Sequence, residues 1–263
     1  MKTIGILGCG WLGLSLGKVL VEQGYKVKGS TTTQNKVSEL KEVGITPYLL
    51  DLATWDEAQG NLFFSNIDTL ILTIPPIRNE EQPTYLSTYT RLLPYIHQHN
   101  IKEVIYTSSV SVYAASPNII TEECILYATE QTAVQIREVE ELLLKDSQFT
   151  TRILRLGGLF GGEREPVRYI CQKHILDNPG LPINMIHLDD IIRFTQALLS
   201  VPVSANEIYN LVSPLYKDRY DYYKQRAELY NLTLPQLSDN NWPMYKKISG
   251  EAIARTTGLD YQY

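Results

Sequence analysis

The sequence has few cysteines and no cluster of metal-binding residues. Cys9, Cys124 and Cys171 are odd in number, widely spaced and form no C-x-x-C pair, which argues against a disulfide framework or a zinc site. His187 has no histidine or cysteine at ligand spacing, so we assign no metal. Cysteines without disulfide partners are typical of proteins in a reducing compartment. We therefore expect the protein in the cytoplasm.

An excess of basic residues and a long hydrophobic run are also missing. The formal net charge is −5, from 24 Lys and Arg against 29 Asp and Glu, which argues against nucleic acid as a partner. The apolar runs are far shorter than the ~20 residues that span a bilayer, so no membrane partner is expected. The 263 residues, 44% of them hydrophobic, suit one large domain or a core domain with a small annex.

The strongest motif lies in the first thirteen residues. A short apolar run ends at Gly8, and Gly8, Gly10 and Gly13 follow at G-x-G-x-x-G spacing before a helical apolar pattern. The first glycine permits a tight turn, the second lets backbone approach a pyrophosphate, and the third lets helix pack against strand. The motif predicts a dinucleotide site that includes Trp11 and Leu12; alternatively, the glycines serve only a tight turn.

Further strand and helix patterns alternate along the next hundred residues. Strands are expected at 27–30, 47–50, 68–74 and 104–107, and this alternation predicts a doubly wound parallel sheet of the α/β class. Ligands of such sheets bind beyond the carboxyl ends of the strands. The candidate cofactor-binding residues at those ends are Ser30, Thr31, Thr32, Asp51, Leu52, Thr73, Pro75 and Thr107.

The end of the second strand bears on the choice between NAD and NADP. An NAD-preferring fold places an acid there to bind the ribose 2′-hydroxyl, but residues 29–32 are Gly-Ser-Thr-Thr, and Lys36 follows. Because no carboxylate repels a 2′-phosphate, the sequence favours NADP over NAD. The alternative is that the threonines only cap the next helix.

Four later motifs occur in a familiar order. They are Thr107 to Tyr113 (TSSVSVY), Arg155 to Gly161 (RLGGLFG), Asn184 to Asp190 (NMIHLDD) and Tyr209 to Leu211 (YNL). With the glycine motif, the chain resembles the atypical branch of the extended short-chain dehydrogenase/reductases, the NAD-dependent epimerase/dehydratase type. This resemblance implies a Rossmann-type core over 1–160, extended by returning segments near 183–212, and a small substrate-side annex mainly over 161–263.

The resemblance also implies an activity. Members transfer a hydride between a nicotinamide and a carbinol or ketone, often on a nucleotide sugar, so a small hydroxylated or sugar-nucleotide-like substrate is expected. The serine that holds the substrate oxygen corresponds to Ser109. Tyr113 and Asn184 are further candidate substrate residues, and Gly157 is expected near the nicotinamide. Relatives often pair two helices between subunits, which makes a homodimer a further expectation.

The family's Tyr-x-x-x-Lys pair has no match in the expected helix from Tyr127. If Glu140 is its usual glutamate, Thr132 and Ile136 occupy the two positions, and neither can act as an acid at neutral pH. Tyr127 is a weaker substitute. Two hypotheses therefore stand: an enzyme that works without the pair, and a non-catalytic dinucleotide sensor or regulatory protein.

Overall fold

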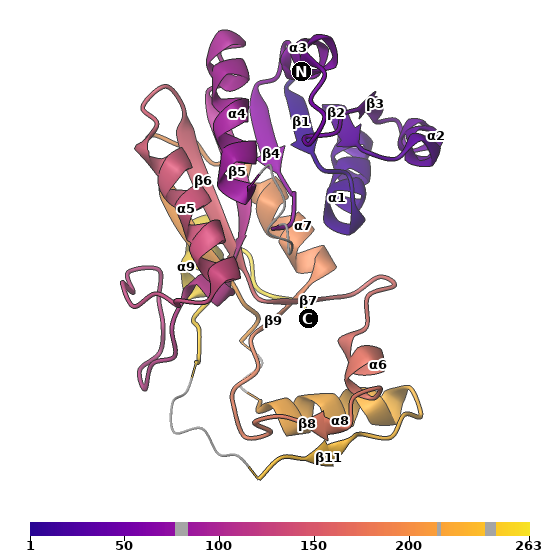
Figure 1. Ribbon diagram of the computed structural model, residues 1–263, viewed down its shortest axis with the longest axis vertical. Coiled ribbons are helices and arrows are strands. Elements are labelled where there is room, and N and C mark those ends of the chain that lie inside the picture. Colours follow the sequence, from indigo (N-terminus) through magenta and orange to yellow (C-terminus); the bar gives the residue numbers. More distant parts are fainter. Residues whose placement is uncertain (77–83, 215–216, 240–245) are drawn as a thin grey trace. The chain divides into compact units, whose positions relative to one another are not determined.

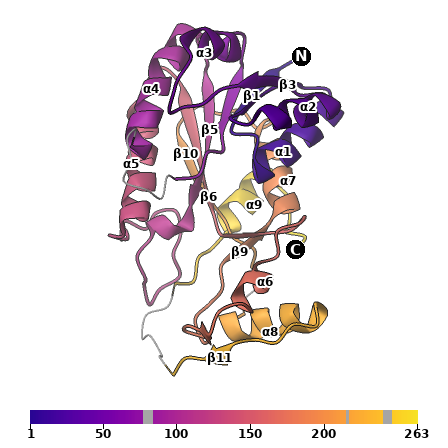
Figure 2. The same ribbon diagram turned by 45° about the vertical axis from the view of Figure 1, so that its right-hand side comes forward.

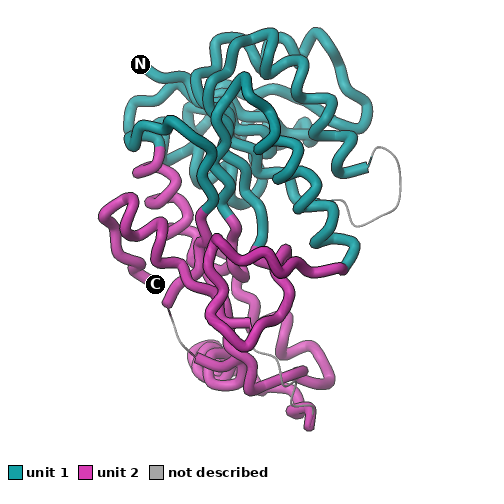
Figure 3. Tube along the Cα trace, turned by 90° about the vertical axis from the view of Figure 1, so that its left-hand side faces the viewer, with its two compact units in different colours: residues 1–109, 130–154, 199–208 teal, residues 110–129, 155–198, 209–263 magenta. Residues whose placement is uncertain are grey.

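The structure is a computed structural model that describes residues 1–76, 84–214, 217–239 and 246–263. It divides into two compact units (Figure 3), the first comprising 1–109, 130–154 and 199–208 and the second 110–129, 155–198 and 209–263. The segment 110–129 belongs to the second unit because Ile120 exchanges backbone hydrogen bonds with Lys247 and Ser249. These bounds differ from the expected division near residue 160. The assignment of one part to the cofactor and the other to the substrate stays a prediction.

A seven-stranded sheet forms the centre of the fold, in the order β10-β6-β5-β4-β1-β2-β3. The strands are β1 (Thr3–Leu7), β2 (Lys26–Thr31), β3 (Thr46–Leu49), β4 (Thr69–Leu72), β5 (Glu103–Ser109), β6 (Thr150–Leu156) and β10 (Glu207–Leu211). β1 pairs in parallel with β2 on one side and with β4 on the other. The chain order therefore reverses at β1, and the predicted doubly wound parallel sheet is confirmed.

Helices cover both faces of this sheet (Figures 1 and 2). The helices of the first unit are α1 (Trp11–Glu22), α2 (Gln34–Glu42), α3 (Glu57–Phe64), α4 (Tyr85–Gln98) and α5 (Gln131–Lys145). α1 and α2 lie on one side, and α4 and α5 lie together on the other. The four residues of β4 are all buried, as expected for a central strand covered on both faces.

The expected helix from Tyr127 begins later, at Gln131, so that prediction was wrong at its start. Tyr127 instead forms an antiparallel bridge with Tyr113, and Ala128 N donates to Val112 O at 2.8 Å. These backbone bonds hold residues 126–128 extended, which a pattern read along one segment does not reveal.

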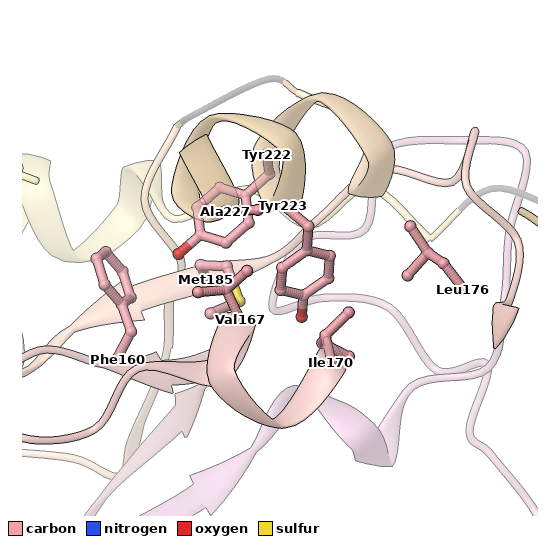
Figure 4. Close-up of a cluster of buried hydrophobic side chains, with 8 residues drawn as sticks. All are labelled: Phe160, Val167, Ile170, Leu176, Met185, Tyr222, Tyr223 and Ala227. Atoms are coloured by element: carbon pink, nitrogen blue, oxygen red, sulfur yellow. The ribbon is translucent and has the colours of Figure 1, made fainter. Parts of the chain in front are cut away.

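The second unit is built from short elements. They are the 3₁₀ turn η1 (Val110–Val112), β7 (Gly158–Phe160), α6 (Pro166–Ile170), β8 (Ile175–Leu176), β9 (Met185–His187), α7 (Leu188–Leu198), α8 (Arg219–Leu229), β11 (Gln236–Leu237) and α9 (Glu251–Thr257). β7 pairs in parallel with β9, so the glycine-containing stretch after β6 forms a strand. Val167 and Ile170 of α6 pack with Tyr222, Tyr223 and Ala227 of α8 in a small core of their own (Figure 4).

A buried arginine joins three strands of the first unit. The Arg152 side chain on β6 donates to Glu103 on β5 at 2.5 Å and to Glu207 on β10 at 2.7 Å. Arg152 Nη2 also donates to the Val201 carbonyl oxygen at 2.7 Å. Glu103 also accepts a hydrogen bond from the Thr69 hydroxyl of β4. These bonds compensate the burial of the charges.

We predict that Arg152→Met lowers the free energy of unfolding by about 3 kcal/mol, because it leaves the Glu103 carboxylate buried without its cation. Urea unfolding measures this change. Lys145→Met is the control, because its contact with Glu141 is exposed and 4.0 Å long and such pairs contribute little. Equal effects of the two substitutions would contradict the prediction.

Candidate functional site

The glycine turn after β1 is fixed by close backbone contacts. Gly8 has a φ of +106°, and Gly10 N donates to Gly8 O at 2.8 Å. A Cβ on Gly13 would lie 2.4 Å from Gly8 O, so the third glycine is needed for α1 to pack here. The Thr73 hydroxyl, after β4, donates to Gly8 O at 2.6 Å and holds the turn against its neighbouring strand.

Gly10 is different, because no described residue fills the space where its side chain would be. Apart from Gly10 itself and its chain neighbours, no atom of the described residues lies within 4 Å of a Cβ built on Gly10. Gly10 is the N-cap residue of α1 and forms no side-chain cap, and the first turn of α1 has no acidic residue. The N–H groups and the positive dipole end at this helix start attract an anion, and Gly10 leaves room for one to approach the backbone.

A cavity of about 440 Å³ opens at this turn, a volume suited to a small-molecule ligand. Its walls are the carboxyl ends of β1 to β4, at the position where the chain order reverses. Nine predicted cofactor residues line it, namely Gly8, Gly10, Ser30, Thr31, Thr32, Asp51, Leu52, Thr73 and Pro75. The lining does not include Trp11, Leu12, Gly13 or Thr107, and Gly157 belongs to the second unit.

The cavity also has residues that the predicted set did not contain. They are Cys9, Thr33, Lys36, Leu50, Ala53, Ile74, Tyr85 and Thr88. Most of them are sequence neighbours of predicted residues, but Tyr85 and Thr88 come from α4. The sequence places Tyr85 and Tyr89 one helical turn apart, a spacing that by itself indicates only packing.

The hydroxyls of Ser30 and Thr31, at the end of β2, each accept a backbone hydrogen bond. The Ser30 hydroxyl accepts a hydrogen bond from Gly8 N at 2.8 Å, so this buried side chain supports the glycine turn. Thr31 Oγ1 accepts from Thr33 N at 3.2 Å. Thr32, Thr33 and Lys36 are exposed at the cavity edge, and residues 26–36 include no acid.

Cys9, between the first two glycines, is a packing residue. Its thiol is buried, and a Cβ on Gly29 would lie 2.6 Å from its sulfur. Burial raises the pKa of Cys9 to about 12. The thiolate is therefore negligible at neutral pH, which argues against a nucleophile.

The serine motif at the end of β5 points its side chains to alternate faces. The Thr107 hydroxyl donates to Leu72 O at 3.0 Å. The buried Ser108 hydroxyl donates to the Glu140 carboxylate of α5. Ser109, the last residue of β5, is half-buried. On α5, Thr132 is exposed and Ile136 is buried, and the helix contains no tyrosine.

In the second unit, Tyr113 is held in a buried polar cluster. Its hydroxyl donates to Asn210 Oδ1 at 2.9 Å and accepts from Arg155 at 2.7 Å. Burial raises the pKa of Tyr113 above its ordinary value, although the Arg155 charge opposes this. Tyr127 is its backbone partner, and the Arg155 guanidinium lies 5.9 Å from the Tyr127 ring centre.

Asn184 lines a cavity of about 710 Å³ that belongs to the second unit. Its amide group is engaged at both ends: Nδ2 donates to Lys246 O at 2.6 Å and Oδ1 accepts from Ile248 N at 3.0 Å. A Cβ on Gly157 would lie 2.9 Å from Asn184 O, so this glycine permits a close backbone approach. The substrate roles of Tyr113 and Asn184 stay predictions.

The described residues contain no group of three or more His, Cys, Asp or Glu side chains that could hold a metal ion. Over the same ranges, every helix is too short or too polar to cross a membrane.

A parallel sheet with a glycine turn at its switch point and a cavity beside it defines a Rossmann-type α/β protein. The sequence profile of the NAD dependent epimerase/dehydratase family matches residues 4–171. The chain is also 32% identical over 269 residues to Protein YeeZ of Escherichia coli K12, covering 100% of this chain and 97% of that protein. It therefore belongs to the NAD dependent epimerase/dehydratase family.

Solved structures share the fold at low sequence identity. The UDP-glucuronic acid 4-epimerase of Bacillus cereus, in complex with UDP-glucuronic acid and NAD, superposes with a TM-score of 0.83 at 16% identity, covering 100% of this chain and 95% of that one. A functionally unknown conserved protein from Silicibacter pomeroyi DSS superposes with a TM-score of 0.80 at 19% identity, with 100% and 94% covered.

Proposed function

We propose that the protein binds a nicotinamide dinucleotide in the cavity of the first unit. The observation that carries this proposal is the open space at Gly10. Gly10 is the N-cap residue of α1 and has no side chain to cap the first N–H groups of the helix. A pyrophosphate placed there is stabilised by hydrogen bonds from the N–H groups of α1 and by the helix dipole. The family name and the NAD bound to the Bacillus cereus epimerase support a nicotinamide rather than another nucleotide.

NADP is proposed as the preferred form. Thr32, Thr33 and Lys36 are exposed at the cavity edge where a ribose 2′-substituent is expected. Hydroxyl donors and one ammonium group favour a 2′-phosphate, and no acid from β2 repels it. Ser30 contributes indirectly, since its side chain holds Gly8.

The proposed activity is hydride transfer to or from a small hydroxylated or sugar-nucleotide-like substrate, as an epimerase/dehydratase or reductase. The dinucleotide, when bound, supplies or accepts the hydride. Ser109 is the proposed catalytic residue that holds the substrate oxygen, with Tyr113 and Asn184 as substrate residues. The activity does not use a Tyr-x-x-x-Lys pair, since Thr132 and Ile136 stand at its positions, and Tyr127 is only a weaker candidate for the tyrosine's role. A homodimer also stays a prediction.

A second candidate function is a non-catalytic dinucleotide sensor or regulatory protein. It is favoured by the environment of Tyr113, whose hydroxyl is already engaged by Asn210 and Arg155. A protein of this kind keeps the nucleotide cavity and needs no proton donor.

We predict that wild-type protein binds NADPH and NADH saturably, and that Gly10→Val weakens both by at least about 30-fold, because the new side chain occupies the anion's space. Nicotinamide fluorescence titration measures the Kd. The fold of Gly10→Val should persist, whereas Gly13→Ala should be destabilised by its clash with Gly8 O. No binding by the wild type would contradict the proposed function, and undiminished binding by Gly10→Val would contradict the location.

Cofactor preference is tested by Thr31→Asp, with Thr31→Asn as the neutral control. Either side chain can still accept from Thr33 N, but only aspartate repels a 2′-phosphate. We expect the Kd for NADPH to rise about 10-fold or more and the Kd for NADH to change less than about 3-fold. Equal effects on both nucleotides would show that the 2′ position lies elsewhere.

Turnover distinguishes the enzyme from the sensor. With a panel of carbonyl and hydroxyl compounds and excess NADPH or NADP, Ser109→Ala should lower kcat about 100-fold and leave the nucleotide Kd unchanged. Ser111→Ala, at a neighbouring exposed position, is the control. Unreduced turnover in Ser109→Ala would remove the catalytic assignment, and tight binding without turnover of the whole panel would favour the sensor.

A further inference from the structure

Three tyrosine hydroxyls meet behind one wall of the first-unit cavity. Tyr85 and Tyr89 are one turn apart on α4, and Tyr106 lies on β5. The Tyr85 hydroxyl oxygen lies 3.2 Å from that of Tyr89 and 3.0 Å from that of Tyr106. Each residue is 1% exposed or less. A buried hydroxyl must find a hydrogen-bond partner, and here the partners are each other and one carbonyl.

That carbonyl belongs to Ile74, in the cavity wall. Tyr85 donates to Ile74 O at 2.9 Å, and the Tyr89 hydroxyl lies 3.3 Å from it. The ladder pairing of β4 ends at Leu72, and Pro75 and Pro76 have no backbone N–H. Within the part of the chain that the structure describes, the hydroxyls of Tyr85 and Tyr89 are the groups positioned to donate to Ile74 O.

The direction of the bonds follows from the number of hydrogens. Tyr85 uses its single hydroxyl hydrogen on Ile74 O, so the hydrogen in its contact with Tyr106 comes from Tyr106. Burial raises the pKa of Tyr85 to about 12, which keeps it a donor at physiological pH. Tyr106 thus orients Tyr85, and Tyr85 holds the wall.

The wall in turn reaches the glycine turn. Thr73, directly before Ile74, donates from its side chain to Gly8 O at 2.6 Å. Tyr85 itself, Thr73, Ile74 and Pro75 all line the cavity. The bonds form one continuous path within the first unit, from Tyr106 through Tyr85 and Ile74 to Thr73 and Gly8.

We propose that Tyr85 and Tyr106 are positioning residues of the nucleotide site, which hold residues 73–75 where Thr73 can fix Gly8. This inference rests on the proposed function, because it assigns a role in nucleotide affinity. It gives the tyrosines of α4 a part in binding, whereas their helical spacing alone indicates packing.

The test compares Tyr85→Phe and Tyr106→Phe with Tyr95→Phe. Tyr95 lies on the same helix, and its hydroxyl accepts from Trp55 Nε1 at 2.8 Å, so its loss also removes one hydrogen bond but does not touch the cavity wall. The Kd of NADPH and NADH and the Tm are measured for each variant. We expect the Kd to rise about fivefold in Tyr85→Phe and about threefold in Tyr106→Phe, and to stay unchanged in Tyr95→Phe although its Tm falls.

A second readout needs no nucleotide. In amide NMR spectra of the free protein, Tyr85→Phe should shift the Gly8 and Gly10 resonances, and Tyr95→Phe should leave them in place. Wild-type protein that binds neither nucleotide would overturn the proposed function, and the positioning of Gly8 would then be judged by these shifts alone. Wild-type binding with unchanged Kd and shifts in Tyr85→Phe would overturn this inference and leave the proposed function standing.

Discussion

The bond between the Thr73 hydroxyl and the Gly8 carbonyl is the contact on which the first unit's cavity depends. It joins the turn after β1 to the end of β4, the two strands that meet where the chain order reverses. The Ser30 hydroxyl holds the same turn from the other side through Gly8 N. With both neighbours bonded to it, the turn keeps Gly10 open and the start of α1 directed at the cavity, which an anion requires.

The second unit contains a buried polar cluster around Tyr113. In its interior the Tyr113 hydroxyl bonds both Arg155 and Asn210, and these partners satisfy a hydroxyl that would be costly to bury alone. These bonds limit the chemistry available to Tyr113. In the same unit, α6 packs against α8 around a small hydrophobic core (Figure 4). This core stabilises the unit from within.

Sequence patterns located the strand ends because their signals are local. Glycine spacing, hydrophobic alternation and the lack of an acid in residues 26–36 are each visible within a short window. Gly8, Gly10, Thr31 and Asp51, which line the cavity, were predicted in this way. Tyr85 and Ile74 were missed, since their partnership joins α4 to the end of β4 across eleven residues. Tyr127 was misplaced for the same reason: its partner is Tyr113, and no helical pattern contains that pairing.

The sequence by itself determined the α/β class, the glycine turn and the family, because these depend on residue types at fixed spacings. Tertiary structure decided how the same residues are used. It directed the Ser30 hydroxyl to Gly8 rather than outward, and bonded the Tyr113 phenol to Asn210 and Arg155. It also placed the Tyr85 and Tyr89 hydroxyls where they can donate to the Ile74 carbonyl. The physical reason is that a buried polar group takes whichever partner the fold brings within reach, and that partner is usually distant in sequence.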